Sequence, residues 1–249
     1  MNKLYQKSET TFSILWIVVY VASFSLADNA SEWIGIPKLI TVGAGILLSL
    51  TAFFWIRKNQ LFQKYGLCRP AIRAKHVLYY IPLAILASCN LWYGVSWRHG
   101  MSETILYILS MLSVGFLEEV IFRGFLFKAM CRDNVRSAII VSSITFGIGH
   151  IVNLFNGSGM ELLPNILQVC NAIVIGFLFT ILFYKGKSLI PCILTHGILN
   201  SLSIFANEQV LSPARRIVNA SAVCAISGAY LLYLLKKVPD GEDQDNETN

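Results

Sequence analysis

Residues 116–127 read FLEEVIFRGFLF, which places Glu118, Glu119 and Arg123 within an otherwise apolar run. Charged side chains are costly in apolar surroundings unless they are paired or have a function there. Two interpretations are therefore open for this stretch. It holds either a buried ion pair that stabilises a fold or a site at which a reaction takes place, and the surrounding sequence is needed to separate them.

The composition of the chain is that of a membrane protein. Hydrophobic residues make up 55% of the 249 residues and charged residues 14%, and the mean hydropathy is +0.59. A helix that crosses a bilayer needs about 20 mostly apolar residues. The sequence has eight runs that meet or approach this length: 11–26, 39–56, 77–97, 104–127, 137–155, 162–184, 188–206 and 217–235. We therefore predict an all-α, polytopic membrane protein of about eight transmembrane helices.

The basic residues are distributed unevenly between the two ends of these runs. Fifteen of the 20 Lys and Arg residues fall at the two termini or after the second, fourth and sixth runs, and four fall in the alternate connections. Cytoplasmic connections are enriched in Lys and Arg. The pattern predicts that both termini are cytoplasmic, and we expect a bacterial plasma membrane. The pI near 9.0 then reflects topology, and no nucleic acid is expected as a partner.

The chain is predicted to form one membrane domain over residues 1–238. The segment 239–249, PDGEDQDNETN, is rich in acidic residues and has no apolar run. Such a composition is typical of a disordered, solvated tail. No separate soluble domain is expected.

Few ionisable residues lie within the predicted spans, and those few fall on three of them. They are Glu118, Glu119 and Arg123 in the fourth run, His150 in the fifth and His196 in the seventh. Such residues usually face a bundle interior or a wet cavity. At about 1.5 Å per residue from the predicted cytoplasmic ends, they lie roughly 13–21 Å into the membrane. We therefore predict a polar intramembrane cavity.

Helical phase separates the two glutamates. At about 100° per residue, Arg123 lies roughly 40° around the helix from Glu119 but about 140° from Glu118. The i, i+4 spacing lets Glu119 and Arg123 pair on one face. Glu118 has no cation on its own face, so its carboxyl group is available as a general base or acid. We predict that Glu118 takes part in catalysis and that the Glu119–Arg123 pair positions other groups. For the pair alone, a purely structural ion pair is the stronger of the two interpretations.

Two further motifs carry polar residues on one helical stripe. Phe146 and His150 are four residues apart in TFGIGH, and His196 and Asn200 have the same spacing in THGILN. A single membrane histidine is more often a hydrogen-bonded core residue than a catalyst. Here both histidines lie beside glycines, which allow helices to approach closely. We therefore expect Glu118, His150, His196 and Asn200 to converge in one cavity.

Together the three motifs carry a resemblance to a known family. EEVIFR fits EExxxR, FGIGH fits FxxxH and HGILN fits HxxxN, in that order. The chain thus resembles the CPBP intramembrane proteases, also called Abi, which comprise CaaX-processing endopeptidases and bacteriocin-processing enzymes. The resemblance covers a core at about residues 104–205. It implies that the protein, surrounded by membrane lipid, hydrolyses a peptide bond in a hydrophobic or lipidated peptide or protein. The implied setting is CaaX-type processing, or the processing of a bacteriocin or pheromone leader, or bacteriocin immunity.

The same resemblance implies a role for each motif residue. Glu118 and His150 would activate a water molecule, with Glu118 as the general base. His196 and Asn200 would stabilise the oxyanion of the tetrahedral intermediate. The residues left with a supporting role are Glu119, Arg123 and Phe146.

The sequence does not decide whether the protein uses a metal cofactor. Enzymes of this family are often named metalloproteases, and Glu118, His150 and His196 would offer three ligands to Zn²⁺ with one position open for water. The helical H-E-x-x-H signature of zinc proteases is absent from the sequence. Glu118 is able to activate water without a metal, and we favour that mechanism, which requires no cofactor.

Two other classes of protein compete with the protease. Buried Glu and His residues also relay protons in proton-coupled transporters, and a non-enzymatic immunity or scaffold protein is possible on the same fold. The sequence shows neither an inverted repeat nor paired broken helices, which many transporters carry. All three motifs are intact, so we predict a CaaX prenyl protease-like intramembrane endopeptidase.

Overall fold

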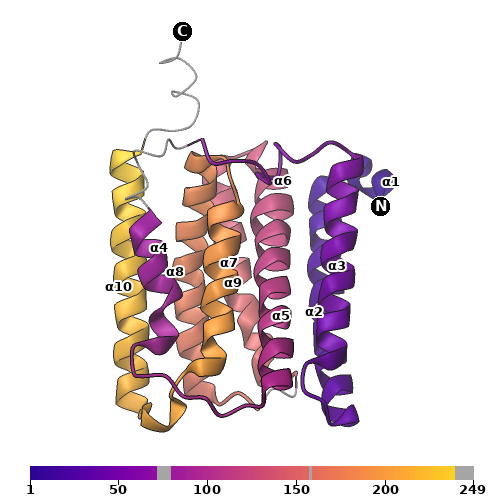
Figure 1. Ribbon diagram of the computed structural model, residues 1–249. Helices are drawn as coiled ribbons and strands as arrows, with labels where there is room; N and C mark the ends of the chain where they lie inside the picture. The colour runs from indigo at the N-terminus through magenta and orange to yellow at the C-terminus, as the bar shows by residue number, and fades with distance from the viewer. Residues whose placement is uncertain (72–79, 157–158, 239–249) are drawn as a thin grey trace.

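The computed structural model describes residues 1–71, 80–156 and 159–238, most of which are helical. Figure 1 shows long helices standing side by side, with α1 and the end of α10 at the same end of the molecule. The α-helices are α1 (Asn2–Lys7), α2 (Glu9–Ile34), α3 (Leu39–Lys58), α4 (Ile81–Ala87), α5 (Met101–Glu118), α6 (Lys128–Cys131), α7 (Val135–Gly149), α8 (Leu162–Gly186), α9 (Ile190–Leu202) and α10 (Pro213–Lys237). Shorter elements are the 3₁₀-helices η2 (Cys89–Leu91), η4 (His150–Leu154), η5 (Ser203–Phe205) and η6 (Glu208–Val210), and the π-helix η3 (Glu119–Phe127).

The all-α membrane architecture is confirmed. Within the described residues, six helices are long and apolar enough to cross a membrane. The predicted run 188–206 appears as the shorter apolar helix Ile190–Phe205. The run 77–97 appears as α4 and η2, with its first residues outside the part of the chain that the structure describes. The predicted tail 239–249 also lies outside the described residues. The chain is a multi-pass membrane protein.

Local sequence sets the ends of several helices. The Ser8 hydroxyl accepts a hydrogen bond from the Thr11 amide at 3.1 Å where α2 begins, and the Asn134 side chain accepts one from the Ser137 amide at 2.8 Å where α7 begins. Such caps satisfy amides that have no partner within the helix. At its other end α2 stops at Gly35, whose φ of +80° is left-handed and costs glycine no strain.

Helix α2 is longer than its apolar run predicts. The predicted span ended at residue 26, but α2 continues to Ile34 and so includes Asp28. The Asp28 carboxylate accepts hydrogen bonds from Lys38 Nζ at 2.9 Å and Thr41 Oγ1 at 2.5 Å. Because these partners satisfy the carboxylate, the helix tolerates it. Helix α2 therefore carries, near its end, a carboxylate that the predicted span did not include.

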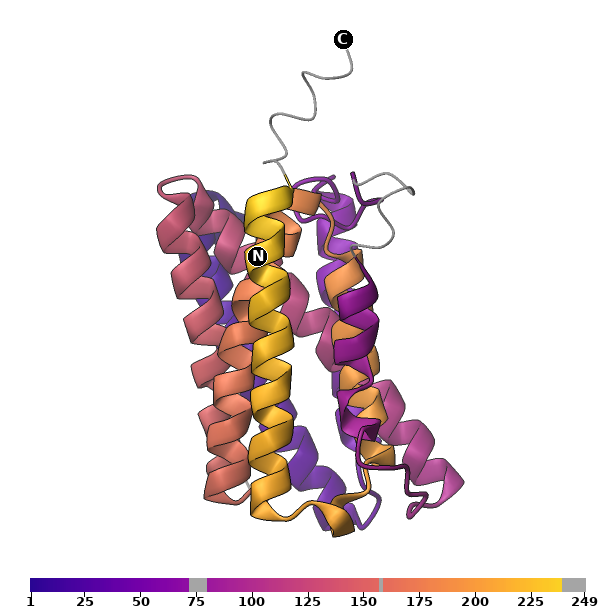
Figure 2. The same cartoon turned by 90° about the vertical axis from the view of Figure 1, so that its left-hand side faces the viewer.

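Close helix crossings bring the motif-bearing helices together. A Cβ atom on Gly115 of α5 would lie 2.6 Å from the Gly197 amide nitrogen of α9. A Cβ atom on Gly147 of α7 would lie 2.7 Å from the Ile173 nitrogen of α8. Only residues without a side chain allow two backbones so near each other. Figure 2 shows the resulting arrangement, with α10 in front, α4 and α9 on one side of it, and α7 and α8 on the other.

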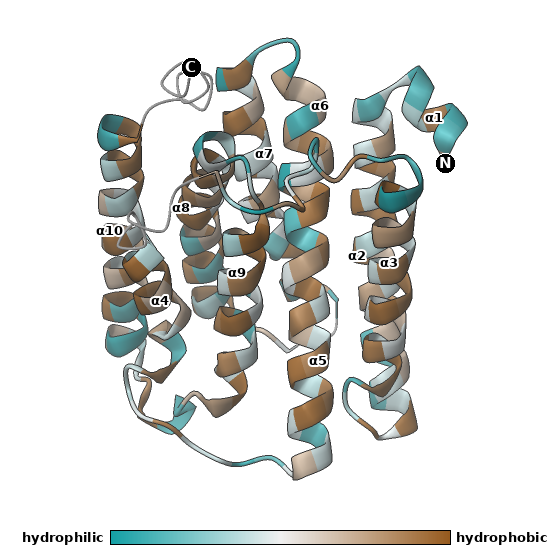
Figure 3. Cartoon of the chain, turned by 45° about the horizontal axis from the view of Figure 1, so that its top comes forward, coloured by the Kyte–Doolittle hydropathy of each residue, from teal (hydrophilic) through white to brown (hydrophobic). Residues whose placement is uncertain are grey.

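The two ends of the bundle differ in charge. We call the end that carries α1 and the α6–α7 connection the basic end, and the other the opposite end. Figure 3 shows hydrophobic residues along the helices and hydrophilic residues on α1 and near the connections. Among the described residues the basic end carries 13 cations: Lys3, Lys7, Arg57, Lys58, Lys64, Arg69, Lys128, Arg132, Arg136, Lys185, Lys187, Lys236 and Lys237. The opposite end carries four: Lys38, Arg98, Arg215 and Arg216.

Candidate active site

Glu118 and Glu119 lie at a change of helix type. Glu118 is the last residue of α5, and Glu119 is the first residue of the π-helix η3, which continues without a break. A π-helical turn is wider than an α-helical turn and is frequent at functional sites. The side chain of Glu118 is 12% exposed, whereas that of Glu119 is fully buried. Two consecutive carboxylates thus occupy different surroundings.

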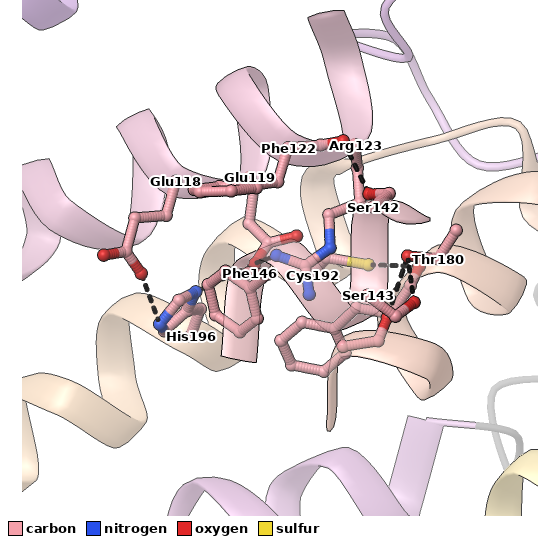
Figure 4. Close-up of polar contacts among 12 residues, drawn as sticks. Glu118, Glu119, Phe122, Arg123, Ser142, Ser143, Phe146, Thr180, Cys192 and His196 are labelled. Carbon is pink, nitrogen blue, oxygen red and sulfur yellow. Dashed lines mark hydrogen bonds and ion pairs between the residues drawn. The ribbon is translucent and has the colours of Figure 1, made fainter. Parts of the chain in front are cut away.

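His196 of α9 lies between the two carboxylates. Its Nδ1 is 2.8 Å from Glu119 Oε1, and its Nε2 is 3.4 Å from Glu118 Oε2. An ionised carboxylate only accepts hydrogen bonds, so the Nδ1–H donates to Glu119. Figure 4 shows Nε2 on the side of the ring that faces Glu118. Glu119 therefore orients the imidazole, as carboxylates commonly do for functional histidines.

The predicted pair between Glu119 and Arg123 is present and fully buried. Arg123 Nη1 donates to Glu119 Oε1 at 3.0 Å, and neither side chain is exposed. The guanidinium carbon of Arg123 lies 4.0 Å from the centre of the Phe146 ring and 5.8 Å from that of Phe179. These aromatic faces stabilise a cation that is removed from water. Phe146, for which the sequence predicts a supporting role, packs on Arg123.

Tyr20 of α2 is a site residue that the sequence motifs do not reveal. Its hydroxyl donates a hydrogen bond to Glu118 Oε1 at 2.7 Å, and the residue is 7% exposed. The two residues are 98 positions apart, and a tyrosine in an apolar run gives no distinct sequence signal. Tyr20 fixes one oxygen of Glu118, while the other oxygen faces His196.

His150 and Asn200 line the same cavity as Glu118 and His196. The Nδ1 of His150 is 3.0 Å from the Phe146 carbonyl oxygen, which accepts a hydrogen bond from the Nδ1–H. Within the described parts of the chain, no hydrogen bond or ion pair joins His150 to Glu118 directly. The Nε2 of His150 is therefore the ring nitrogen left to face other groups. The structure brings the four predicted catalytic residues to one cavity but places only Glu118 and His196 in contact.

The cavity is large enough to hold a segment of peptide. Its volume is about 650 Å³, within the usual range of ligand sites. Its walls combine aromatic and aliphatic side chains with the polar groups of the motifs. The residues that line it near Glu118 are Tyr20, Val114, Phe122, Phe146, His150, Phe179, His196 and Asn200. A mostly apolar wall with a few convergent polar groups is typical of a ligand-binding cavity.

The residues do not form the zinc site that the sequence left open. In the described segments, no three His, Cys, Asp or Glu side chains gather closely enough to hold a metal ion. A catalytic zinc site needs three protein ligands and an open position. Glu118 and His196 supply two neighbouring donor atoms, whereas the His150 ring makes its hydrogen bond to a backbone carbonyl.

The comparison with known families points to the same segment of the chain. Residues 100–202 match a family described as Rce1-like, type II CAAX prenyl endopeptidase. The match includes all three motifs and excludes Tyr20. No curated protein sequence matches the chain.

Proposed function

Because residues 100–202 match the Rce1-like family of type II CAAX prenyl endopeptidases, we propose that this chain is a CPBP-type intramembrane endopeptidase in which Glu118 activates the attacking water. Its substrate is a hydrophobic or lipidated peptide or protein. The observation that carries this proposal is the position of His196 between Glu118 and Glu119, at a cavity inside the helix bundle.

The first step is the attack of water on the peptide carbonyl carbon. Glu118 takes a proton from the water, since Tyr20 occupies its Oε1 whereas its Oε2, 3.4 Å from His196 Nε2, has no hydrogen-bond partner among the described residues. General base catalysis of this kind contributes about 10²- to 10⁴-fold in rate. The new C–O bond gives a tetrahedral intermediate with a negative oxygen. Glu118 then returns the proton to the leaving nitrogen as the C–N bond breaks.

The negative oxygen of the intermediate needs hydrogen-bond donors. His196 and Asn200 are one helical turn apart on α9 and both line the cavity. Because its Nδ1–H is bound to Glu119, His196 donates from Nε2 as an imidazolium, and Asn200 donates from its side-chain amide. His150 faces the same space from the end of α7 and shares the handling of the water with Glu118. Donors that are oriented before the reaction stabilise the transition state by a few kcal/mol each.

Glu119 and Arg123 act through His196 and do not touch the substrate. Both are fully buried, and Glu119 accepts hydrogen bonds from both Arg123 and His196. Arg123 is itself held against Phe146. The pair therefore positions the imidazole, so its loss is expected to affect both folding and activity.

Cleavage of quenched hydrophobic peptides by the purified protein tests this proposal. Variants Glu118→Gln, His150→Ala and His196→Ala are expected to lose cleavage while remaining folded. Glu103→Gln is the matched control, because Glu103 lies on the same helix but is 37% exposed and pairs with His99. Wild-type rates in Glu118→Gln would overturn the mechanism.

The metal-free mechanism has its own test in the same assay. Addition of a chelator is expected to leave the rate of peptide cleavage unchanged. Loss of cleavage that Zn²⁺ restores would contradict the metal-free mechanism but would leave the protease assignment intact.

A further inference from the structure

A second pocket lies at the opposite end of the bundle. Its volume is about 430 Å³, and it is lined by the α2–α3 turn, the segment around the start of α5 and the elements η5 and η6. Figure 1 shows the α2–α3 turn and the start of α5 at the same end of the molecule. The pocket adjoins the Glu118 cavity but contains no residue of the three motifs, and no step of the proposed mechanism uses it.

Two charged contacts at this pocket are made within the chain. The Nδ1 of His99 lies 2.8 Å from Glu103 Oε1, and Lys38 Nζ donates a hydrogen bond to Asp28 Oδ1 at 2.9 Å. An ammonium group has three N–H donors, so Lys38 keeps donors for a second partner.

Arg98 and Glu208 line the same pocket without pairing with each other. Arg98 Nη2 donates to the Ala206 carbonyl oxygen at 3.1 Å, which holds the side chain in place. Its other N–H groups make no hydrogen bond to the described residues. Within the same parts of the chain, the Glu208 carboxylate makes neither a hydrogen bond nor an ion pair. The pocket therefore presents a guanidinium and a carboxylate that are both available to a ligand.

A ligand of a single sign fits this pocket poorly. Lys38 and Arg98 repel a simple cation, and Glu103 and Glu208 repel a simple anion. A molecule that carries separate anionic and cationic groups meets a partner for each. The planar guanidinium of Arg98 suits a phosphate, and the Glu208 carboxylate accepts hydrogen bonds from a primary ammonium.

The surroundings of the pocket are those of a membrane–water interface. Trp33, near the end of α2, and Trp97, beside Arg98, are both exposed. Tryptophan is enriched where a bilayer meets water. Leu39 of α3 and Ile105 of α5 are also exposed, and both belong to helices long and apolar enough to cross a membrane. A headgroup in the pocket would therefore have apolar helix surface beside it for its acyl chains.

From this arrangement we infer that the pocket binds the headgroup of a phospholipid that carries a phosphodiester and a primary amine, as phosphatidylethanolamine does. The phosphate contacts Arg98 and Lys38, and the ammonium contacts Glu208. In the described part of the chain, no hydrogen bond or ion pair joins residues 35–38 to Arg98 or Glu208. The lipid thus links the α2–α3 turn to the far wall of the pocket. This inference goes beyond the proposed protease function and does not depend on it.

Native mass spectrometry of the purified full chain tests the inference. The protein is released from detergent with equal amounts of dioleoyl phosphatidylethanolamine, phosphatidylcholine or phosphatidylglycerol. Phosphatidylcholine keeps the phosphate but has no N–H donor for Glu208, and phosphatidylglycerol has no cationic group. The wild-type chain is expected to retain phosphatidylethanolamine about fivefold better than either, since an exposed ion pair contributes up to about 1 kcal/mol. Equal retention of the three lipids would overturn the inference.

Variants assign the binding to the pocket. Arg98→Gln and Glu208→Gln are each expected to lose the preference for phosphatidylethanolamine. Arg215→Gln and Glu161→Gln are the matched controls, because both residues are at the same end and line neither pocket. Arg215 also bonds a backbone carbonyl, that of Val210, as Arg98 bonds that of Ala206. A preference that persists in Arg98→Gln and Glu208→Gln, or that is lost equally in the controls, would overturn the site.

Thermal unfolding separates the lipid from a soluble source of the same headgroup. Phosphatidylethanolamine is expected to raise the melting temperature of the wild-type chain but not that of Glu208→Gln. The side chain of Glu208 is exposed, so this variant is expected to unfold at the wild-type temperature without lipid and to report on binding even where Arg98→Gln does not fold. Glycerophosphoethanolamine, which lacks acyl chains, is expected to have no effect at the same concentration. An equal effect of this soluble compound would overturn the lipid as the ligand.

Discussion

A glutamate carboxylate lies on each side of the His196 ring, and the two carboxylates differ in exposure and in their partners. On one side Glu118 is 12% exposed, accepts a hydrogen bond from Tyr20 and lines the cavity. On the other side Glu119 is fully buried and paired with Arg123. The comparison shows that consecutive, identical side chains take different roles when one faces open space and the other faces a sealed core. In the proposed mechanism the first carboxylate transfers protons and the second orients the imidazole.

The largest effect on catalysis is expected from Glu118→Gln. Glutamine keeps the size of the side chain and its contact with Tyr20 but does not accept a proton from water. We expect the rate of peptide cleavage to fall by about 10³-fold, within the range attributed to general base catalysis. The melting temperature in detergent is expected to change little, since the side chain is partly exposed and unpaired with any cation of its own helix. A folded Glu118→Gln protein with near-normal cleavage would show that Glu118 is not the general base.

The sealed side of the comparison is tested by Arg123→Met. This change leaves Glu119 buried without its cation, so we expect a loss of about 3–5 kcal/mol of stability. The double variant Glu119→Leu/Arg123→Met removes both charges, and thermal unfolding is expected to show that most of the stability returns. Its cleavage activity is expected to stay low, because His196 has lost the acceptor at Nδ1. Recovery of activity along with stability would show that the pair has only a structural role.

Local patterns were enough to predict part of this site. The apolar runs predicted the long helices, and the i, i+4 spacing predicted the Glu119–Arg123 pair, because both depend on residues near one another in the sequence. The contact of Tyr20 with Glu118 joins residues 98 positions apart, and that of His196 with Glu119 joins residues 77 apart. These contacts depend on how helices pack, which helical spacing alone does not determine.

The change to a π-helix at Glu119 was also beyond prediction. The run 119–127 is about as apolar as the α-helical residues before it, so its sequence does not predict a π-helix. Asp28 escaped prediction for a related reason. Its position after the apolar run 11–26 indicated a helix end, whereas its partners Lys38 and Thr41 lie on the far side of a turn.

The packing that joins the two sides of His196 is tested by Gly115→Ala. A methyl group at Gly115 would lie 2.6 Å from the Gly197 nitrogen, so α5 and α9 must move apart. We expect cleavage to fall by about 10²-fold, since a displacement near 1 Å has this effect at a catalytic site. Gly228→Ala on α10 is the matched control, because nothing lies within 4 Å of its added methyl group. Equal activity in both variants would show that the close crossing does not position Glu118.

The smallest effect on catalysis is expected from Tyr20→Phe, which alters only the Glu118 side of the His196 ring. The change removes one hydrogen bond to Glu118 Oε1 and keeps the ring and its packing on Phe24. A hydrogen bond to a charged group contributes about 1.5–3 kcal/mol, and the lower end of this range corresponds to a fall of about 10-fold in kcat. Because Tyr20 orients Glu118 and does not hold the peptide, KM is expected to stay constant. Tyr107→Phe is the control, since Tyr107 lines the cavity but bonds Ser203, so it is expected to keep kcat. A change in KM alone for Tyr20→Phe would show that Tyr20 binds the substrate and does not orient Glu118.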